Sequence, residues 1–198
     1  MKRDIAFFDF DGTITKSDSL FDFIKMAVGK FEFYKGLFVL SPLLLGHLFR
    51  IIPNYKAKER LFKYYFKDKN EKVFNAIARK YALNYIDKIT KLEALDKINW
   101  HKSQDHEVVI VSASIENWIK PWSDNKNIAL LATKIEVINN SITGNFLTKN
   151  CYGLEKVKRI KEKYNLKEYN KVFVYGDSKG DKEMLELASK KERFFRCF

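Results

Sequence analysis

Two aspartates, Asp9 and Asp11, stand two positions apart at the end of the apolar run "DIAFFDF", and Gly12 and Thr13 follow them directly. Carboxylates at the end of a buried strand are costly unless a cation balances them. A hard cation such as Mg²⁺ prefers oxygen ligands and often holds substrate phosphates. With the charge balanced, one carboxylate can attack phosphorus, and its neighbour can serve as general acid and then base.

Three apolar runs rich in branched and aromatic residues must position these carboxylates. They are "DIAFFDF", "HEVVIVSAS" around Val109 and "NKVFVYGDS" around Phe173, and each suits a strand buried on both faces. Helical patterns such as "IENWIKPW", "GLEKVKRIKEKY" and "DKEMLELASKK" lie between and after them, as a parallel α/β sheet requires. Ligands of such sheets bind beyond the carboxyl ends of the strands. We therefore expect "DFDGT", "SAS" and "GDSKGD" to converge there, with Asp9 and Asp177 sharing the Mg²⁺ ion.

Residues 16–91 differ from the rest, because they carry almost no strand signal and are predicted to form several helices. These include "SLFDFIKMAV", the very apolar "KGLFVLSPLLLGHLFRII", "AKERLFKYYF" and "EKVFNAIARKYALNYIDKITK". The segment lies between the first two core strands, so it is predicted to be a helical cap that faces the site. The core would then comprise residues 1–15 and 92–198, with an additional hairpin at "KIEVINNSITGNFL".

The composition is that of a folded protein with one compact domain and a smaller insertion. Of its 198 residues, 46% are hydrophobic and 15% aromatic. Two cysteines, Cys151 and Cys197, do not suggest a disulfide framework or a cysteine-rich zinc site. Asp9 and Asp11 interrupt the first apolar run before a signal peptide could form. We therefore expect a cytoplasmic protein.

The net charge of +12 favours an anionic partner: nucleic acid, a membrane surface or a phosphorylated metabolite. A lysine-rich composition without a specific ligand is an equal alternative. The basic segment "EKVKRIKEKY" alternates with acids, which is typical of a solvated helix face, so no specific nucleic acid is expected.

Taken together, these residues resemble the haloacid dehalogenase (HAD) superfamily, in particular its phosphoserine-phosphatase-like branch with a helical cap. The resemblance covers almost the whole chain and rests on four ordered motifs. They are "DFDGT" at Asp9 to Thr13, "VIVSAS" ending at Ser114, a lysine in "NCYGLEKVKRI" at Lys156, and "GDSKGD" from Gly176 to Asp181. It implies a Rossmann-like, doubly wound, mainly parallel α/β sheet with an inserted helical cap.

The resemblance also implies catalytic roles. Asp9 would be the nucleophile and a metal ligand, and Asp11 would protonate the leaving alkoxide and bind metal through its backbone carbonyl. Asp177 would complete the protein's share of the Mg²⁺ ligands. Lys156 would offset charge on the transferring phosphoryl oxygens. Asp181 would orient Lys156 or a metal-bound water.

Further residues are assigned to the phosphate and the substrate in the same way. The Ser112 hydroxyl, the backbone N–H of Ala113 and the donors around Gly12 would bind phosphate. Thr13 would steady the loop through its hydroxyl, or simply pack. Asp18 lies close to where this branch holds a substrate amine, and it suits a helix N-terminus equally. The second motif reads "SAS" where phosphoserine phosphatases typically carry Ser-Gly-Gly, which leaves serine specificity open.

The apolar cap segment 37–52 is flanked by basic residues: Lys30, Lys35, Arg50, Lys56 and Lys58. It is shorter than the roughly 20 residues that span a bilayer, and Pro42 and Gly46 interrupt it. It is either a buried cap helix or an amphipathic element on an anionic membrane. A similar stretch, and a similar "NCYGLEK", occur in bacterial phosphatidylglycerophosphatases of this branch.

The sequence therefore predicts a Mg²⁺-dependent phosphomonoester hydrolase that acts through an aspartyl-phosphate on a phosphorylated small molecule or a lipid phosphate such as phosphatidylglycerophosphate. In the second case the protein would sit peripherally at the inner face of the membrane. The alternative with the same chemistry is a soluble metabolite phosphatase, including phosphoserine phosphatase. The alternative of another class is a non-catalytic module that associates with membrane or nucleic acid.

Overall fold

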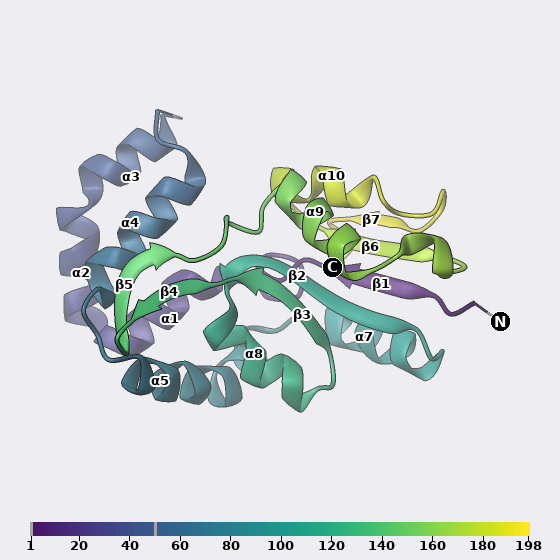
Figure 1. Cartoon of the computed structure of the whole chain (residues 1–198), viewed down its shortest axis with the longest axis horizontal. Coiled ribbons are helices and arrows are strands. Elements are labelled where there is room, and N and C mark those ends of the chain that lie inside the picture. The colour runs from purple at the N-terminus through teal and green to yellow at the C-terminus, as the bar shows by residue number, and fades with distance from the viewer. Residues whose placement is uncertain (1, 50) are drawn as a thin grey trace.

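A five-stranded sheet forms the centre of the molecule (Figure 1). The computed structural model describes residues 2–49 and 51–198. In sheet order the strands are β3 (Ala129–Thr133), β2 (Glu107–Ile115), β1 (Ile5–Phe8), β6 (Val172–Gly176) and β7 (Arg193–Phe195). Every neighbouring pair runs parallel. The prediction of a doubly wound, mainly parallel α/β sheet is confirmed.

Helices cover both faces of the sheet, which is why its central strands are mostly apolar. In Figure 1, α7 (Leu92–Ser103) and α8 (Glu116–Asn125) lie below the sheet, and α9 (Leu154–Lys163) and α10 (Lys182–Leu185) lie above it. The side chains of β1 alternate between the two layers. Ala6 and Phe8 join the cluster on one face, and Ile5 and Phe7 join the cluster on the other.

The cap consists of short helices around an aromatic core. They are α1 (Ser19–Val28), α2 (Lys30–Val39), α3 (Ser41–Leu48), α4 (Asn54–Phe66), α5 (Glu71–Asn84) and α6 (Ile86–Ile89). The ring of Phe23 packs within 5.5 Å, between centroids, of Phe66, Phe74 and Tyr81. These contacts tie α1 to α4 and α5.

The apolar segment predicted as one helix forms two, α2 and α3, with the break at Leu40. Pro42 has no N–H to donate to the carbonyl of Phe38. That carbonyl instead accepts a hydrogen bond of 2.7 Å from the hydroxyl of Ser41. The helix predicted from "DKEMLELASKK" is also shorter than expected: it follows a 3₁₀ turn (Lys179–Asp181) and ends at Leu185.

The predicted hairpin is present as β4 (Ile135–Ile138) and β5 (Ser141–Phe146), an antiparallel pair outside the main sheet. Its Ile142 exchanges backbone hydrogen bonds with Asp68 and Lys69, at 2.8 and 2.9 Å, just after α4. We propose a division into a core of residues 1–15 and 92–198 and a cap of residues 16–91, with this hairpin packed against the cap.

Within the described residues, none of the helices combines the length and the hydropathy that crossing a membrane requires.

Candidate active site

The topology brings the first, second and fourth motifs to one edge of the sheet. β1 pairs with β2 on one side and with β6 on the other, so Phe8 lies opposite both Ile110 and Tyr175. The N–H of Asp9 donates to the carbonyl of Tyr175 at 2.9 Å, which extends the β1–β6 ladder by one residue. The predicted convergence at the carboxyl ends of the strands is therefore observed.

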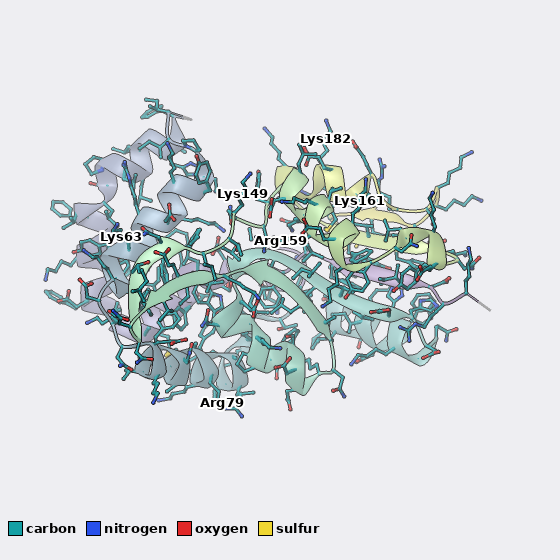
Figure 2. All side chains as sticks on the ribbon, in the orientation of Figure 1. Lys63, Arg79, Lys149, Arg159, Lys161 and Lys182 are labelled. Carbon is teal, nitrogen blue, oxygen red and sulfur yellow. The ribbon has the colours of Figure 1, made fainter. Side chains whose placement is uncertain are left out.

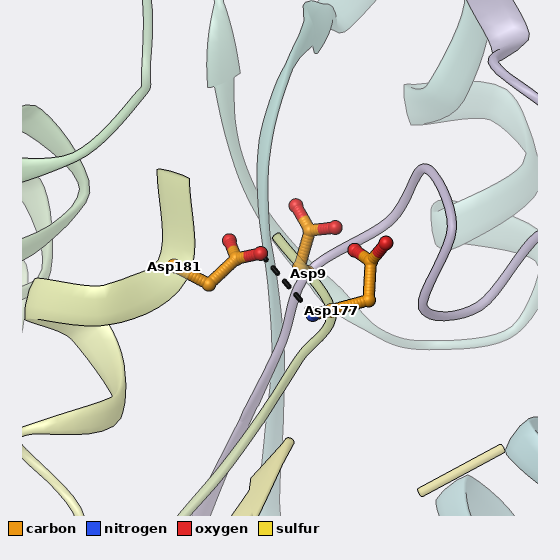
Figure 3. A group of neighbouring side chains, drawn as sticks. All are labelled: Asp9, Asp177 and Asp181. Carbon is orange, nitrogen blue, oxygen red and sulfur yellow. Dashed lines mark hydrogen bonds between the residues drawn. The ribbon is translucent and has the colours of Figure 1, made fainter. Parts of the chain in front are cut away.

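Three carboxylates gather at this edge, as Figure 3 shows. Asp9, Asp177 and Asp181 each offer an oxygen, and these oxygens lie within 4.8 Å of one another. The hydroxyl of Thr13 lies 3.3 Å from Oδ2 of Asp9 and 3.2 Å from Oδ1 of Asp177, so it bridges the two loops. Clustered oxygen donors are the kind of ligands that Mg²⁺ takes, and this donor set fits a hard cation.

A buried lysine balances part of this charge. Nζ of Lys156, at the start of α9, bonds Oδ1 of Asp9 and lies 2.6 Å from Oδ1 of Asp181. Burial alone would lower the pKa of Lys156, but the two carboxylates outweigh burial and raise that pKa. Burial raises the pKa of Asp9 to about 7, against the opposing effect of Lys156. Lys156 therefore remains a fixed positive charge beside Asp9.

Both carboxylate oxygens of Asp181 accept hydrogen bonds from other groups of the protein. Sequence spacing alone did not predict these contacts. Its Oδ1 accepts from Lys156, and its Oδ2 accepts from the N–H groups of Asp177 and Ser178 at 3.2 and 3.0 Å. Burial raises the pKa of Asp181, but Lys156 and the hydrogen bonds from Ser178 outweigh burial and lower that pKa. Gly176 is required beside it, because a Cβ there would lie 2.5 Å from Cβ of Asp181. Asp181 thus orients Lys156 and the Asp177 loop.

The carboxylate of Asp11 turns away from the cluster, toward the start of the cap. Its Oδ1 accepts from the N–H of Ser19 at 2.7 Å, and its Oδ2 accepts from the hydroxyl of Ser114. The Ser19 hydroxyl lies 3.1 Å from that of Ser114 and accepts from Nε1 of Trp118 at 3.2 Å. Burial, followed by the charge of Asp18, raises the pKa of Asp11. The sequence showed no role for Ser19 or Trp118, because their meeting depends on the cap packing over β2.

The expected phosphate-binding groups line the same edge. Ser112 is buried, and its Oγ accepts from the N–H of Ser114 at 3.0 Å. The β2–β3 register shifts between Ser112 and Ile115, which places Ala113 and Ser114 in an irregular stretch. Gly12 has φ +84°, and a Cβ there would lie 2.4 Å from Oδ2 of Asp177. Only glycine therefore leaves room for that carboxylate.

The comparison with known families follows this geometry. Residues 6–186 match the family described as haloacid dehalogenase-like hydrolase. The chain belongs to this family. The N-terminal, serine-loop, lysine and C-terminal aspartate motifs all lie within the matched residues.

Individual relatives of this hydrolase family extend the comparison. Protein CicA of Caulobacter vibrioides is 29% identical over 193 residues, which cover 96% of this chain and 85% of CicA. A crystal structure of a Bordetella pertussis protein of unknown function has a TM-score of 0.83 at 19% identity, covering 95% of this chain and 88% of that one. A structure titled as the phospho-aspartyl intermediate analogue of phosphoserine phosphatase has a TM-score of 0.61 at 18% identity, covering 95% and 84%. These structural likenesses establish a shared fold.

Two charged residues of the cap side lie near Asp11 in this hydrolase. Asp18 is the N-cap of α1, where its Oδ1 accepts from the N–H of Leu20 at 2.9 Å. Lys58 of α4 lines a small cavity with Ala113 and Ser114, and its charge opposes the rise in the pKa of Asp11. The sequence placed Lys58 only among the basic flanks of the apolar segment, because its position over β2 arises from the fold of α4.

A cleft of about 670 Å³ lies between the start of α4 and the segment that precedes α9. Its walls are the start of α4, including Asn54 and Tyr55, and the segment from Phe146 to Glu155. Asn54 Oδ1 and Asn150 Nδ2 are buried there without a hydrogen-bond partner among the described residues. The Thr133 hydroxyl bonds both Asn150 and the carbonyl of Ala113, which connects this wall to the serine loop.

Proposed function

We propose that this protein is a Mg²⁺-dependent phosphomonoester hydrolase that forms an aspartyl-phosphate on Asp9. The observation that carries the proposal is the placement of Asp9 between the buried cation of Lys156 and the carboxylate of Asp177. A cation on one side and a metal site on the other would stabilise negative charge developing on a transferring phosphoryl group. The phospho-aspartyl analogue seen in a protein of the same fold is consistent with this chemistry.

In the first step, a carboxylate oxygen of Asp9 attacks phosphorus, and the bond from phosphorus to the ester oxygen breaks. Asp11, whose pKa is raised by burial, would give a proton to the departing oxygen as the general acid. In the second step, Asp11 takes a proton from water as that water attacks phosphorus. The bond from phosphorus to the Asp9 oxygen breaks, phosphate leaves, and both carboxyl groups return to their starting states.

The remaining groups hold the phosphoryl oxygens and the metal. Ser112, the N–H of Ala113 and the loop at Gly12 would bind the oxygens, with Lys156 neutralising their charge. Asp9, Asp177 and the backbone carbonyl of Asp11 would hold Mg²⁺, which supplies further charge neutralisation when bound.

Two substrate classes share this chemistry. One is a lipid phosphate such as phosphatidylglycerophosphate, and the other is a soluble metabolite such as phosphoserine. The cleft between the start of α4 and residues 146–155 is lined by polar and charged side chains and by an apolar part with Tyr55, Phe146 and Leu147, and this apolar part would suit a substrate with an apolar portion. Asp18 already caps α1, which leaves its carboxylate less suited to hold a substrate amine.

The direct test is hydrolysis of an aryl phosphate. We expect turnover with Mg²⁺, loss of turnover with EDTA, and loss of nearly all turnover in Asp9→Asn. Asp124→Asn, which changes an exposed aspartate on α8, serves as the matched control and should retain full activity. If the wild type has no Mg²⁺-dependent turnover of aryl, lipid or metabolite phosphates, the chain is a binding module and the proposal is wrong.

A further inference from the structure

The outer side of the cap exposes a group of large apolar side chains on α2, α3 and the turn after α3. The α2–α3 apolar face, as we call it, comprises Phe31, Phe38, Leu45, Leu48, Phe49 and Ile51. Their exposed fractions are 80, 82, 51, 72, 71 and 77%. Scattered exposed apolar residues are ordinary, but four on two consecutive short helices and two on the turn that follows are of the kind that marks an interaction site.

The exposed side chains of this face lie outside the packed core of the cap. The inner sides of α2 and α3 supply the packing, through Phe33, Gly36 and Leu43, which are buried. The hydroxyl of Tyr65 on α4 donates to the carbonyl of Phe33 at 2.6 Å and anchors α2. The segment 37–52 is therefore apolar on both sides, and one side faces solvent.

The turn that carries Phe49 and Ile51 is held by hydrogen bonds. The N–H groups of Ile51 and Ile52 donate to the carbonyl of Gly46 at 2.9 and 3.0 Å, and Nδ1 of His47 lies 3.0 Å from the carbonyl of Ile52. The exposed side chains are thus presented by a defined backbone, which lowers the entropic cost of binding.

The charges around this face indicate which kind of partner would bind it. Between positions 30 and 58, Glu32 is the one acidic residue in the sequence, and it pairs with Lys35 at 3.3 Å. Lys30 and Lys56 are exposed, whereas Arg50 lies outside the described residues. A second copy of this chain would bring a like-charged face and a net charge of +12 against it. An anionic lipid surface matches both the apolar side chains and the basic flanks.

The position of the face agrees with docking on a bilayer. In Figure 1, α2 and α3 form the edge of the cap farthest from the sheet. Figure 2 shows Lys149, which lines the cleft, and Lys182 on the same upper side of the view as α3.

We propose that the α2–α3 apolar face binds the protein peripherally to anionic membranes. The apolar side chains enter the interfacial layer, and the surrounding lysines contact the lipid phosphates. Binding does not require turnover, so it stands or falls separately from the proposed phosphatase activity.

Vesicle cosedimentation tests the proposal. The wild type should sediment with vesicles of phosphatidylglycerol mixed with phosphatidylcholine, much less with pure phosphatidylcholine, and less as salt is raised. Leu48→Ser/Phe49→Ser/Ile51→Ser should weaken binding by about tenfold or more while leaving the melting temperature nearly unchanged, because these side chains are exposed. Asp9→Asn should bind as the wild type does.

A matched control removes three exposed apolar side chains elsewhere, at Val73, Leu92 and Ile138, whose exposed fractions are 60, 70 and 56%. Serine at these positions should leave vesicle binding unchanged. The proposal is wrong if the wild type ignores anionic vesicles, or if both triple variants bind alike. It is also wrong if light scattering shows that the face joins two copies of the chain in place of lipid.

Discussion

Nζ of Lys156 lies 2.6 Å from Oδ1 of Asp181 and also bonds Asp9, with all three side chains buried. Neither carboxylate would tolerate burial without this cation, since an unpaired buried charge is costly. Asp181 is itself fixed by the N–H groups of Asp177 and Ser178. Asp181 therefore fixes the position of the Lys156 ammonium group, and no substrate is needed for this.

Replacing Lys156 with alanine should reduce kcat/KM by about 30- to 1,000-fold, which corresponds to roughly 2–4 kcal/mol of transition-state stabilisation. The matched control is Lys158→Ala on the same helix, because that side chain is 60% exposed and pairs with Glu162 on the surface. Steady-state kinetics with an aryl phosphate, alongside circular dichroism, measures the effect on folded protein. A Lys156 variant with a near-wild-type rate would exclude this lysine from the site.

Gly12 and Gly29 form a natural pair for testing the metal loop, because both have φ +84°. Alanine at either position is strained because φ is positive there, at a cost of about 1–3 kcal/mol. Only at Gly12 would the new Cβ meet a carboxylate, at 2.4 Å from Asp177, whereas nothing lies within 4 Å of the corresponding position at Gly29. We expect Gly12→Ala to raise the Mg²⁺ concentration for half-maximal activity at least about tenfold, and Gly29→Ala to leave it unchanged. Equal effects would show that backbone strain alone matters.

Mg²⁺ binding should depend on pH through Asp9, whose pKa burial raises to about 7. Below that pH the carboxyl group is protonated and neutral, so a proton competes with the metal. Affinity should rise about tenfold per pH unit up to pH 7 and then level off, with proton uptake by buffer on binding at about pH 6. Titration calorimetry in buffers of different ionisation enthalpy measures both quantities. An affinity independent of pH, with no proton released, would contradict this assignment.

The core strands and the convergence of their acidic ends follow from local sequence. Phe7, Val109 and Phe173 each lie in an apolar run that suits a strand covered on both faces, and polar residues end each run. The outer strands β3 and β7 were not predicted. β7 has only three residues, Arg193–Phe195, and its pairing with Val174 gives no local signal.

The contacts within the site depended on the tertiary fold. Sequence placed Asp11 beside Asp9, but not its bonds to Ser19 and Ser114, which are 8 and 103 positions away. The position of Lys58 near Ala113 and Ser114 likewise depends on how α4 packs over the serine loop. The split between α2 and α3 could have been inferred from Pro42, since proline at that position removes a helical hydrogen bond.

The most direct test of the account is to trap the phosphoryl group on Asp9. In Asp11→Asn the water that attacks the intermediate lacks its base, while an aryl leaving group needs little help from an acid, so the intermediate should accumulate. Acid quenching during turnover of an aryl phosphate with Mg²⁺, followed by peptide mass spectrometry, should find one phosphoryl group on the peptide that contains Asp9. The covalent role of Asp9 would be contradicted if aryl alcohol is released in a burst but the phosphoryl group is found on another residue or on no residue.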